Sequence, residues 1–399
     1  MITAGVGILL VILGILTIGG AEAETSHHAF HWTQRLFANL WINNVYFTGI
    51  AIIGVFFLAL QYVAAAGWSA YLKRIPEAFG YWLPFAFILM IGVFYIASHD
   101  LFHWTHETLY IEFLDDGSKN PDYDHIIAGK EPFLNTTFYL LRMGSYFAIW
   151  FFLFWLIRRE SLAEDLDGKV QHWHNMVKYS AIFIVFFAVS SSVATWDWIL
   201  SIDTHWFSTL IGWYVFASWF VCGLAVITLI VINLKENGYL EFLTPNHLHD
   251  MGKFIFAFSI FWTYLWVSQF LLIYYANLPE ETIYYYERIN SDFYAPFFYV
   301  NLLLNFFFPF LALMTRDSKR HTIILKIVCV GVLIGHWLDF YLMVTPGVLK
   351  GNGGFGFMEI GVTLIYLAAF LFVVLSNLAK VPLIAKNHPM MEESLNHHI

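Results

Sequence analysis

His336 and Asp339 are the pair of residues whose types and spacing point most directly to chemistry. They lie three residues apart in the apolar stretch 322–344, so in a helix both side chains project from one face. An aspartate at the centre of a membrane costs roughly 2.5–3.5 kcal/mol, so Asp339 needs a partner, a hydrated cavity or a proton. The pair is a candidate for proton transfer, and a mutually satisfied structural pair is the alternative.

The densest group of ionisable residues is the segment Ser98-His99-Asp100-Leu101-Phe102-His103-Trp104-Thr105-His106-Glu107. If a helix continues through it, His99 and His103 lie one turn apart, as do Asp100 and His103. Histidine titrates near neutral pH and a neighbouring carboxylate can hold its tautomer, which suits proton exchange with water or a quinol. An ordinary polar cap at the membrane surface is the alternative.

Asp197 stands between two tryptophans near the end of another apolar stretch, with His205 shortly after it. A rise of about 1.5 Å per residue from Lys178 puts Asp197 close to the outer interface, where deep burial is not required. Its carboxylate could accept a proton or cap the next helix, and both interpretations remain open. Arg142 and Glu359 are further ionisable residues in or beside apolar stretches, and Arg142 is a candidate counter-ion whose partner the sequence does not name.

The sequence predicts no cofactor or metal bound by this chain. Cys222 and Cys329 both fall inside apolar stretches, and no Cys-x-x-Cys-His motif is present for covalent haem attachment. A b-type haem needs two histidines at matching depth, and only His336 is deep. His247 and His249 form a His-x-His pair, which without a third ligand is a weak metal motif. Phosphate-loop and nucleophile-elbow motifs of other enzyme classes are also missing.

The elements that must position these residues are membrane-spanning helices. Hydrophobic residues make up 59% of the chain and charged residues 12%, and runs of about 20 apolar residues can cross a membrane only as helices. The net charge of −9 carries no basic stripe, so nucleic acid is excluded as an expected partner. We predict ten spans, at about 2–20, 45–67, 82–98, 136–157, 177–199, 211–233, 254–276, 293–314, 322–344 and 357–378.

The distribution of lysine and arginine predicts the orientation. Ten crossings put both termini on one side, and the loops and tails of that side carry twelve lysines and arginines, which makes it cytoplasmic. The other side carries five: Arg35, Lys119, Lys130, Arg288 and Lys350. The first 20 residues lack the positively charged start of a secretion signal, so we expect a retained first transmembrane helix.

A weak internal repeat aligns the second to fifth spans with the sixth to ninth. Asp197 ends the fifth span and Asp339 lies in the ninth, and two four-helix bundles in one orientation would explain this spacing. We therefore divide the chain into a first helix and outer segment at 1–44, a first bundle at 45–210, a second bundle at 211–350, and a last helix with a polar cytoplasmic tail at 351–399. The longest connection, about 99–135, could cover the bundle or contact a partner.

Several strings resemble a known family. They are Ser98-His99-Asp100-Leu101-Phe102-His103-Trp104, the run from Asp197-Trp198 to His205-Trp206-Phe207-Ser208-Thr209, His249-Asp250-Met251-Gly252-Lys253-Phe254, Trp262-Thr263-Tyr264-Leu265-Trp266-Val267-Ser268-Gln269-Phe270 and Asn277-Leu278-Pro279-Glu280-Glu281-Thr282. Over residues 30–350 the chain resembles the NrfD-like, ActF-type membrane subunit of bacterial alternative complex III, a quinol:cytochrome c oxidoreductase.

The resemblance implies ten helices in two four-helix bundles with two flanking helices, in a bacterial cytoplasmic (inner) membrane. It implies a second NrfD-like subunit, iron–sulfur and multihaem cytochrome c subunits and lipids as partners, with a terminal oxidase as a further partner. Menaquinol or another quinol is the substrate of the complex, and haem c and iron–sulfur clusters sit in partner subunits. This shorter type carries no redox centre and is implied to conduct protons, with His99, Asp100, His103, Asp197, His205, His336 and Asp339 as candidate residues.

The leading hypothesis is a subunit that is not catalytic by itself and couples quinol chemistry to proton movement. A purely structural subunit, whose polar groups only satisfy one another, is the first alternative. A secondary transporter is the second, and its helices would be broken by Gly or Pro at mid-depth. The sixth and seventh spans show no such break, although Pro309 interrupts the eighth near its cytoplasmic end.

Overall fold

The computed structural model describes residues 2–22 and 32–398, and this part of the chain is an all-α, multi-pass membrane protein. Within it, nine helical segments are long and apolar enough to cross a membrane, and α1 adds a shorter apolar helix. Helices dominate because hydrocarbon offers no hydrogen-bond partner to the backbone, so each span must satisfy its own N–H and C=O groups.

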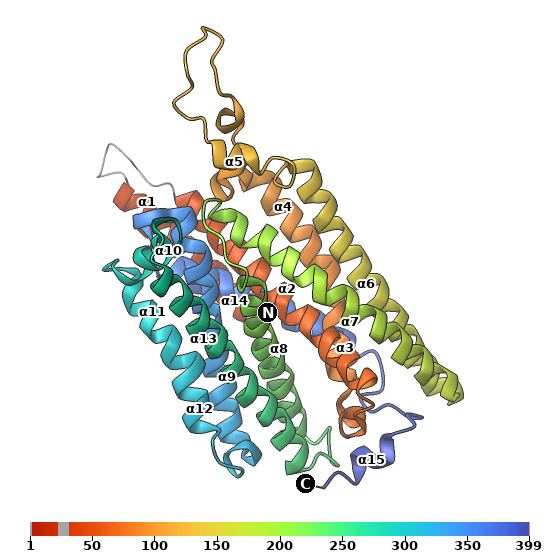
Figure 1. The fold of residues 1–399 in the computed structure, drawn as a ribbon. Helices are drawn as coiled ribbons and strands as arrows, with labels where there is room; N and C mark the ends of the chain where they lie inside the picture. The colour runs from red at the N-terminus through yellow and green to blue at the C-terminus, as the bar shows by residue number, and fades with distance from the viewer. Residues whose placement is uncertain (1, 23–31, 399) are drawn as a thin grey trace.

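The long helices follow the order predicted from hydropathy (Figure 1). Their bounds are α1 Ile2–Glu22, α2 Trp32–Val63, α4 Leu83–Leu101, α6 Thr136–Asp167, α7 Val170–Trp198, α8 Ile211–Glu236, α9 Pro245–Ala276, α11 Tyr294–Leu302, α12 Phe308–Ala312, α13 Thr322–Leu349 and α14 Phe357–Leu378. A π-helical turn, Leu303–Phe307, joins α11 to α12. The shorter helices are α3 Arg74–Phe79, α5 His125–Gly129, α10 Pro279–Ile289 and α15 Met391–Leu395.

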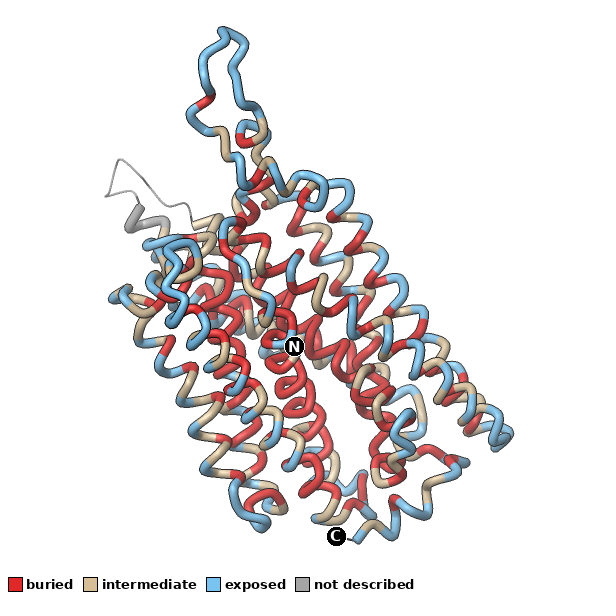
Figure 2. Tube along the Cα trace, in the orientation of Figure 1, coloured by how far each residue is buried: buried red, intermediate tan, exposed pale blue. Residues whose placement is uncertain are grey.

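The helices form two groups of four that meet along α2 and α8. The first group consists of α2, α4, α6 and α7, in which α2 and α6 each pack against both α4 and α7. In the second group α8 packs against α9 and α13. The eighth span completes this group, with α11 against α13 and α12 against α9. In the most apolar stretch of α2, and likewise of α8, 89% of the residues are buried. Figure 2 shows α8 buried along most of its length. These two helices are therefore the centre of the molecule.

The flanking helices α14 and α1 pack as a pair beside the first group. α14 contacts α2 and α3, and α1 runs along α14. A Cβ atom built on Gly7 of α1 would lie 2.8 Å from the Gly361 carbonyl oxygen of α14, and one on Gly361 would lie 2.8 Å from the Gly7 carbonyl oxygen. Glycine at both positions lets the two backbones approach, as small residues do in membrane helix pairs.

Several helices extend beyond the predicted spans. α2 begins at Trp32 rather than at 45, so the predicted division at residues 44 and 45 falls inside a helix. α6 continues to Asp167, α7 starts at Val170 and α9 starts at Pro245, each outside the predicted range. Hydropathy reports only the part of a helix that is apolar, and these ends are polar or amphipathic, so they were missed.

Local signals set the helix ends. The Asn135 side chain accepts a hydrogen bond from the Phe138 N–H at 2.9 Å and caps α6, and Gly168, at φ +65°, ends it. Pro245 starts α9 after Thr244, whose hydroxyl lies 2.9 Å from His247 Nδ1. The segment 102–135 projects from one end of the molecule, and the C-terminus lies at the other (Figure 1). The side of segment 102–135 is the predicted outer side and is called so below.

Candidate functional site

Asp339 lies at the centre of a buried polar network in the second helix group. It is 2% exposed and projects from α13 toward α8, α9 and α11. Four neutral side chains donate hydrogen bonds to its two carboxylate oxygens: Tyr214, Ser218 at 2.7 Å, Trp262 at 3.1 Å and Asn301 at 3.0 Å. Such a set of donors stabilises the ionised carboxylate without supplying a positive charge.

No ion pair within residues 2–22 and 32–398 includes Asp339. A buried charge is expensive, and buried acids are usually paired with a base, coordinated to a metal or protonated. Asp339 is therefore a buried acid whose negative charge is not balanced by a cationic side chain among the described residues. It can hold either a negative charge or a proton, depending on conditions outside the network.

His336 joins this network through the Ser218 hydroxyl. The Ser218 oxygen lies 3.0 Å from His336 Nδ1 and 2.7 Å from Asp339 Oδ2, so one hydroxyl contacts both groups. His336 is fully buried and its ring packs edge-on against Trp262. Its Nε2 atom has no hydrogen-bond partner in the part of the chain that the structure describes. A hydroxyl can donate on one side while it accepts on the other, so Ser218 can relay a proton from a protonated His336 to an ionised Asp339, which leaves both groups neutral, or relay it back.

The π-helical turn at Leu303–Phe307 extends the network along the eighth span. Asn305 Nδ2 donates to Asn301 Oδ1 at 2.5 Å, and Asn301 in turn donates to Asp339. Both asparagines are buried, and a Cβ on Gly335 would lie 2.2 Å from Asn305 Oδ1, so Gly335 makes room for this side chain. Single π-helical turns occur often at functional sites. The sequence indicated an interruption at Pro309, whereas the irregular turn precedes that proline.

Asp197, at the corresponding place in the first helix group, has a different environment. It lies in the last turn of α7, near the end of the helix as expected from helix rise, and its carboxylate is fully buried among protein side chains. Arg142 of α6 binds both oxygens, with Nη2 at 2.7 Å from Oδ1 and Nε at 2.9 Å from Oδ2, and the Tyr146 hydroxyl donates at 3.2 Å. Arg142 also lies over the ring of Phe133. The counter-ion predicted from sequence is thus the partner of Asp197, which lies in the last turn of α7 and does not cap α8.

The histidines of segment 98–107 do not form the predicted helical ladder. α4 ends at Leu101, Phe102 is extended and a 3-10 turn begins at His103, so His99 and His103 do not stack along one helix. Thr105 Oγ1 lies 3.1 Å from His99 Nδ1, and Asp100 accepts a hydrogen bond from Gln34 at 3.2 Å. The His106 ring lies between the other two, with ring centroids 5.1 Å from His99 and 5.6 Å from His103, so the histidines form a compact polar cluster without a continuous helix.

The outer histidines belong to the protein surface. Burial lowers the pKa of His103, and the nearby His106 lowers it further. His205 Nε2 lies 2.6 Å from Asp124 Oδ2. Burial raises the pKa of Asp124, but hydrogen bonds from the Ile127 N–H and from His205 outweigh it, so the net pKa lies below its ordinary value. His205 and Asp124 connect segment 102–135 to the α7–α8 connection.

Sequence reasoning missed a buried charge cluster at the end of the first group that lies opposite segment 102–135. Glu77 accepts hydrogen bonds from Arg74 at 2.8 Å and from Arg158 and Ser161, and Lys73 Nζ lies 2.5 Å from Glu164 Oε2. These side chains lie just beyond the apolar stretches. In a sequence, lysine and arginine at such positions indicate only how the chain is oriented in the membrane. Only the folded chain brings the opposite charges together.

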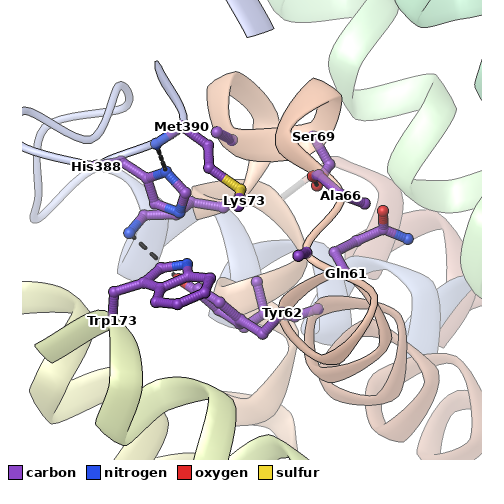
Figure 3. A pocket seen from close by; sticks show the side chains of 11 residues that line it. Gln61, Tyr62, Ala66, Ser69, Lys73, Trp173, His388 and Met390 are labelled. Atoms are coloured by element: carbon purple, nitrogen blue, oxygen red, sulfur yellow. Dashed lines mark hydrogen bonds between the residues drawn. The ribbon is translucent and has the colours of Figure 1, made fainter. Parts of the chain in front are cut away.

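The C-terminal tail covers this cluster. His388 lies beside Lys73, Tyr62 and Trp173 around a small pocket (Figure 3), and the Ser394 hydroxyl donates to the Trp68 carbonyl at 2.6 Å. Burial lowers the pKa of His388 to about 3, with the positive charge of Lys73 adding to the effect. Burial also lowers the pKa of Lys73, although Glu77 and Glu164 oppose it. The described part of the tail therefore packs against the helices.

The structure separates the seven candidate residues into three sets. His336 and Asp339 share one network, Asp197 pairs with Arg142, and His99, Asp100, His103 and His205 lie at the outer surface. Across residues 2–22 and 32–398 no three His, Cys, Asp or Glu side chains are grouped so that they could hold a metal ion. No protein-family model matches the sequence, and no curated protein matches it at a significant level.

Proposed function

We propose that this chain is a proton-handling membrane subunit of a quinol-oxidising electron-transfer complex. The observation that carries the proposal is the environment of Asp339, a buried carboxylate with four neutral hydrogen-bond donors and no cationic partner among the described residues. An ionisable residue in that position is a functional-site candidate, because an apolar side chain could fill the same space without the desolvation cost of a buried charge.

The contrast with Asp197 supports a specific role for the second helix group. Arg142 supplies a positive charge to Asp197 through two hydrogen-bonded contacts. Asp339 has no such arginine beside it in the described part of the chain and instead contacts the Ser218 hydroxyl, which also contacts His336. Ser218 and His336 can both exchange a proton with the carboxylate. In the proposed mechanism a proton passes between Asp339 and His336 in either direction. The Ser218 hydroxyl relays it, because it donates to one of the two groups while it accepts from the other.

The complex itself is proposed from the resemblance to the ActF-type subunit of alternative complex III. In that assignment the partners are a second NrfD-like subunit and subunits carrying iron–sulfur clusters and haem c, all in a bacterial cytoplasmic membrane. Quinol oxidation in a partner releases protons and electrons, and this chain moves protons only. The buried network at Asp339 fits a role in which no electron carrier is bound by this chain.

The test is Asp339→Asn in the intact complex. Turnover of quinol with cytochrome c and proton uptake by sealed vesicles are both measured, and subunit composition is checked on a gel. We expect a normal assembly and a loss of about 100-fold in proton-coupled turnover, the lower end of what a positioned proton-transfer group contributes. The matched control is Glu236→Gln, which removes an acid of the same charge from an exposed pair with Lys326. Unchanged turnover and uptake in Asp339→Asn would refute the proposal.

A further inference from the structure

Segment 102–135 contains a hairpin that stands away from the helices on the outer side (Figures 1 and 2). Its two arms meet at an isolated antiparallel bridge between Phe113 and Lys119. The Leu114 N–H donates to the Ser118 carbonyl at 2.9 Å across the turn, and Gly117 adopts φ +79°, which glycine accommodates without strain. The tip therefore has a defined turn conformation.

Asn120 fixes the base of this hairpin. It is 5% exposed, and its Nδ2 donates to the carbonyl oxygens of Thr108 and Ile111, at 2.8 Å each. Its backbone N–H donates to the Glu112 carbonyl at 3.0 Å, so the arms are tied together below the tip. A segment held in this way pays little conformational entropy when a partner binds it.

The tip of the hairpin exposes three apolar side chains to water. Ile111, Phe113 and Leu114 are 49%, 59% and 43% exposed. Many other exposed apolar side chains lie on the membrane-spanning helices, and further ones, such as Phe207 and Leu278, lie on connections. The hairpin differs in that it projects beyond the helix ends (Figure 2). Clustered apolar side chains on a water-facing projection mark an interaction site.

The same hairpin is strongly acidic. Residues 107–124 carry six carboxylates and one lysine: Glu107, Glu112, Asp115, Asp116, Asp122, Asp124 and Lys119. Two such tips would repel one another, so a second copy of this chain is a poor partner. An anionic membrane surface is disfavoured for the same reason. Charge complementarity requires a partner whose contact surface is rimmed by lysine and arginine.

We propose that the hairpin tip docks into an apolar recess, rimmed by basic side chains, on a water-soluble domain at the outer side of the membrane. Ile111, Phe113 and Leu114 together form the apolar part of the contact, and the carboxylates of Asp115 and Asp116 face the basic rim. The inference is independent of the proton role, because it uses none of the residues around Asp339. Loss of the docking contact would leave the Asp339 network intact.

The experiment uses a single reactive cysteine. The natural cysteines, Cys222 and Cys329, are fully buried, so Phe113→Cys adds the one thiol that a membrane-impermeant maleimide can reach. Its labelling rate is compared between right-side-out vesicles and the purified full-length chain in detergent. We expect labelling at least about tenfold slower in the vesicles, and recovery after a wash in about 1 M salt, where electrostatic attraction is screened within about 3 Å.

Two further variants make the result specific. Asn290→Cys, at an exposed position on the outer side, is the labelling control and is expected to react at similar rates in both samples. Asp115→Asn with Asp116→Asn, added to Phe113→Cys, is expected to raise the vesicle labelling rate severalfold. Equal labelling of Phe113→Cys in both samples, protection that salt does not relieve, or equal protection of Asn290→Cys would each overturn the proposal.

A photo-cross-linker attached to the same thiol identifies the occupant. We expect an adduct with a soluble domain whose cross-linked peptide lies beside lysine or arginine. An adduct with lipid, with another copy of this chain, or with no protein at all would overturn the proposal. Because Phe113 lies on the surface of a turn, its replacement leaves the helix packing intact, and Leu114→Cys provides a second attachment point if the first label disturbs the tip.

Discussion

The Ser218 hydroxyl lies 2.7 Å from the Asp339 carboxylate and, at 3.0 Å, also contacts the His336 ring. This contact joins an acid and a base on α13 through a residue of α8, one of the two central helices. The corresponding acid of the first helix group, Asp197, has an arginine instead. The two groups therefore share an architecture and differ in the charge that their buried acids can carry.

The Ser218 bridge predicts a difference between two variants that each remove one hydroxyl next to Asp339. Ser218→Ala breaks the connection to His336, whereas Tyr214→Phe removes a donor and leaves the bridge in place. We expect proton uptake to fall about tenfold or more in Ser218→Ala and less in Tyr214→Phe, with both complexes assembled. Equal losses would mean that the number of donors matters and the bridge does not.

The Arg142–Asp197 pair predicts a stability effect without a proton-transfer effect. Arg142→Gln leaves Asp197 charged and buried, which costs about 3–5 kcal/mol in comparable cases. We expect a large drop in the thermal unfolding midpoint in detergent, and recovery of much of it when Asp197→Asn is added. The control is Lys326→Gln in the exposed pair with Glu236, where about 1 kcal/mol or less is expected. A double variant as unstable as Arg142→Gln would contradict this assignment.

The docked tail is expected to depend on pH through His388. Its pKa is about 3 when docked and about 6.5 when the tail is free, so the free tail binds a proton first as pH falls. Docking is therefore fully stable above pH 6.5 and weakens as pH falls below it, by about 2 kcal/mol between pH 7 and 5. The charged groups that influence His388 are Lys73 and Arg74, which lower its pKa, and Glu77, which raises it.

Hydrogen exchange of residues 387–395, corrected for the intrinsic effect of pH, measures this docking. The expected result is a loss of protection from pH 7 to 5 in the natural chain and a smaller loss in His388→Gln. The same pH dependence in both proteins would show that His388 is not responsible. The contact between His397 Nε2 and Asp250 Oδ2, at 2.7 Å, is unchanged in both proteins, so its own response to pH cancels in the comparison.

Much of the fold could be predicted from the sequence, because a run of about 20 apolar residues has only one way to satisfy its backbone in hydrocarbon. The shared face of His336 and Asp339 also followed from helical spacing. Helix ends such as Trp32 and Asp167 were missed because polar extensions of a span carry no hydropathy signal. The π-helical turn was missed as well, since no residue pattern specifies it.

The partners of the candidate residues were less predictable. Tyr214, Ser218 and Asn301 come from two other helices, and their contact with Asp339 depends on how those helices pack. A usable signal was present in Asn301 and Asn305, two amides four residues apart in an apolar stretch. Arg142 was identified as a counter-ion, but sequence spacing alone could not connect it with Asp197, 55 residues away.

Infrared difference spectroscopy of the intact complex, recorded between its oxidised and quinol-reduced states, tests the role of Asp339 most directly. The protonated carboxyl group has its own stretching band, which appears or disappears when a buried acid gains or loses a proton. We predict such a band in the natural complex and in Glu236→Gln, and its loss in Asp339→Asn. An unchanged carboxyl band in Asp339→Asn would contradict the claim that Asp339 exchanges protons during turnover.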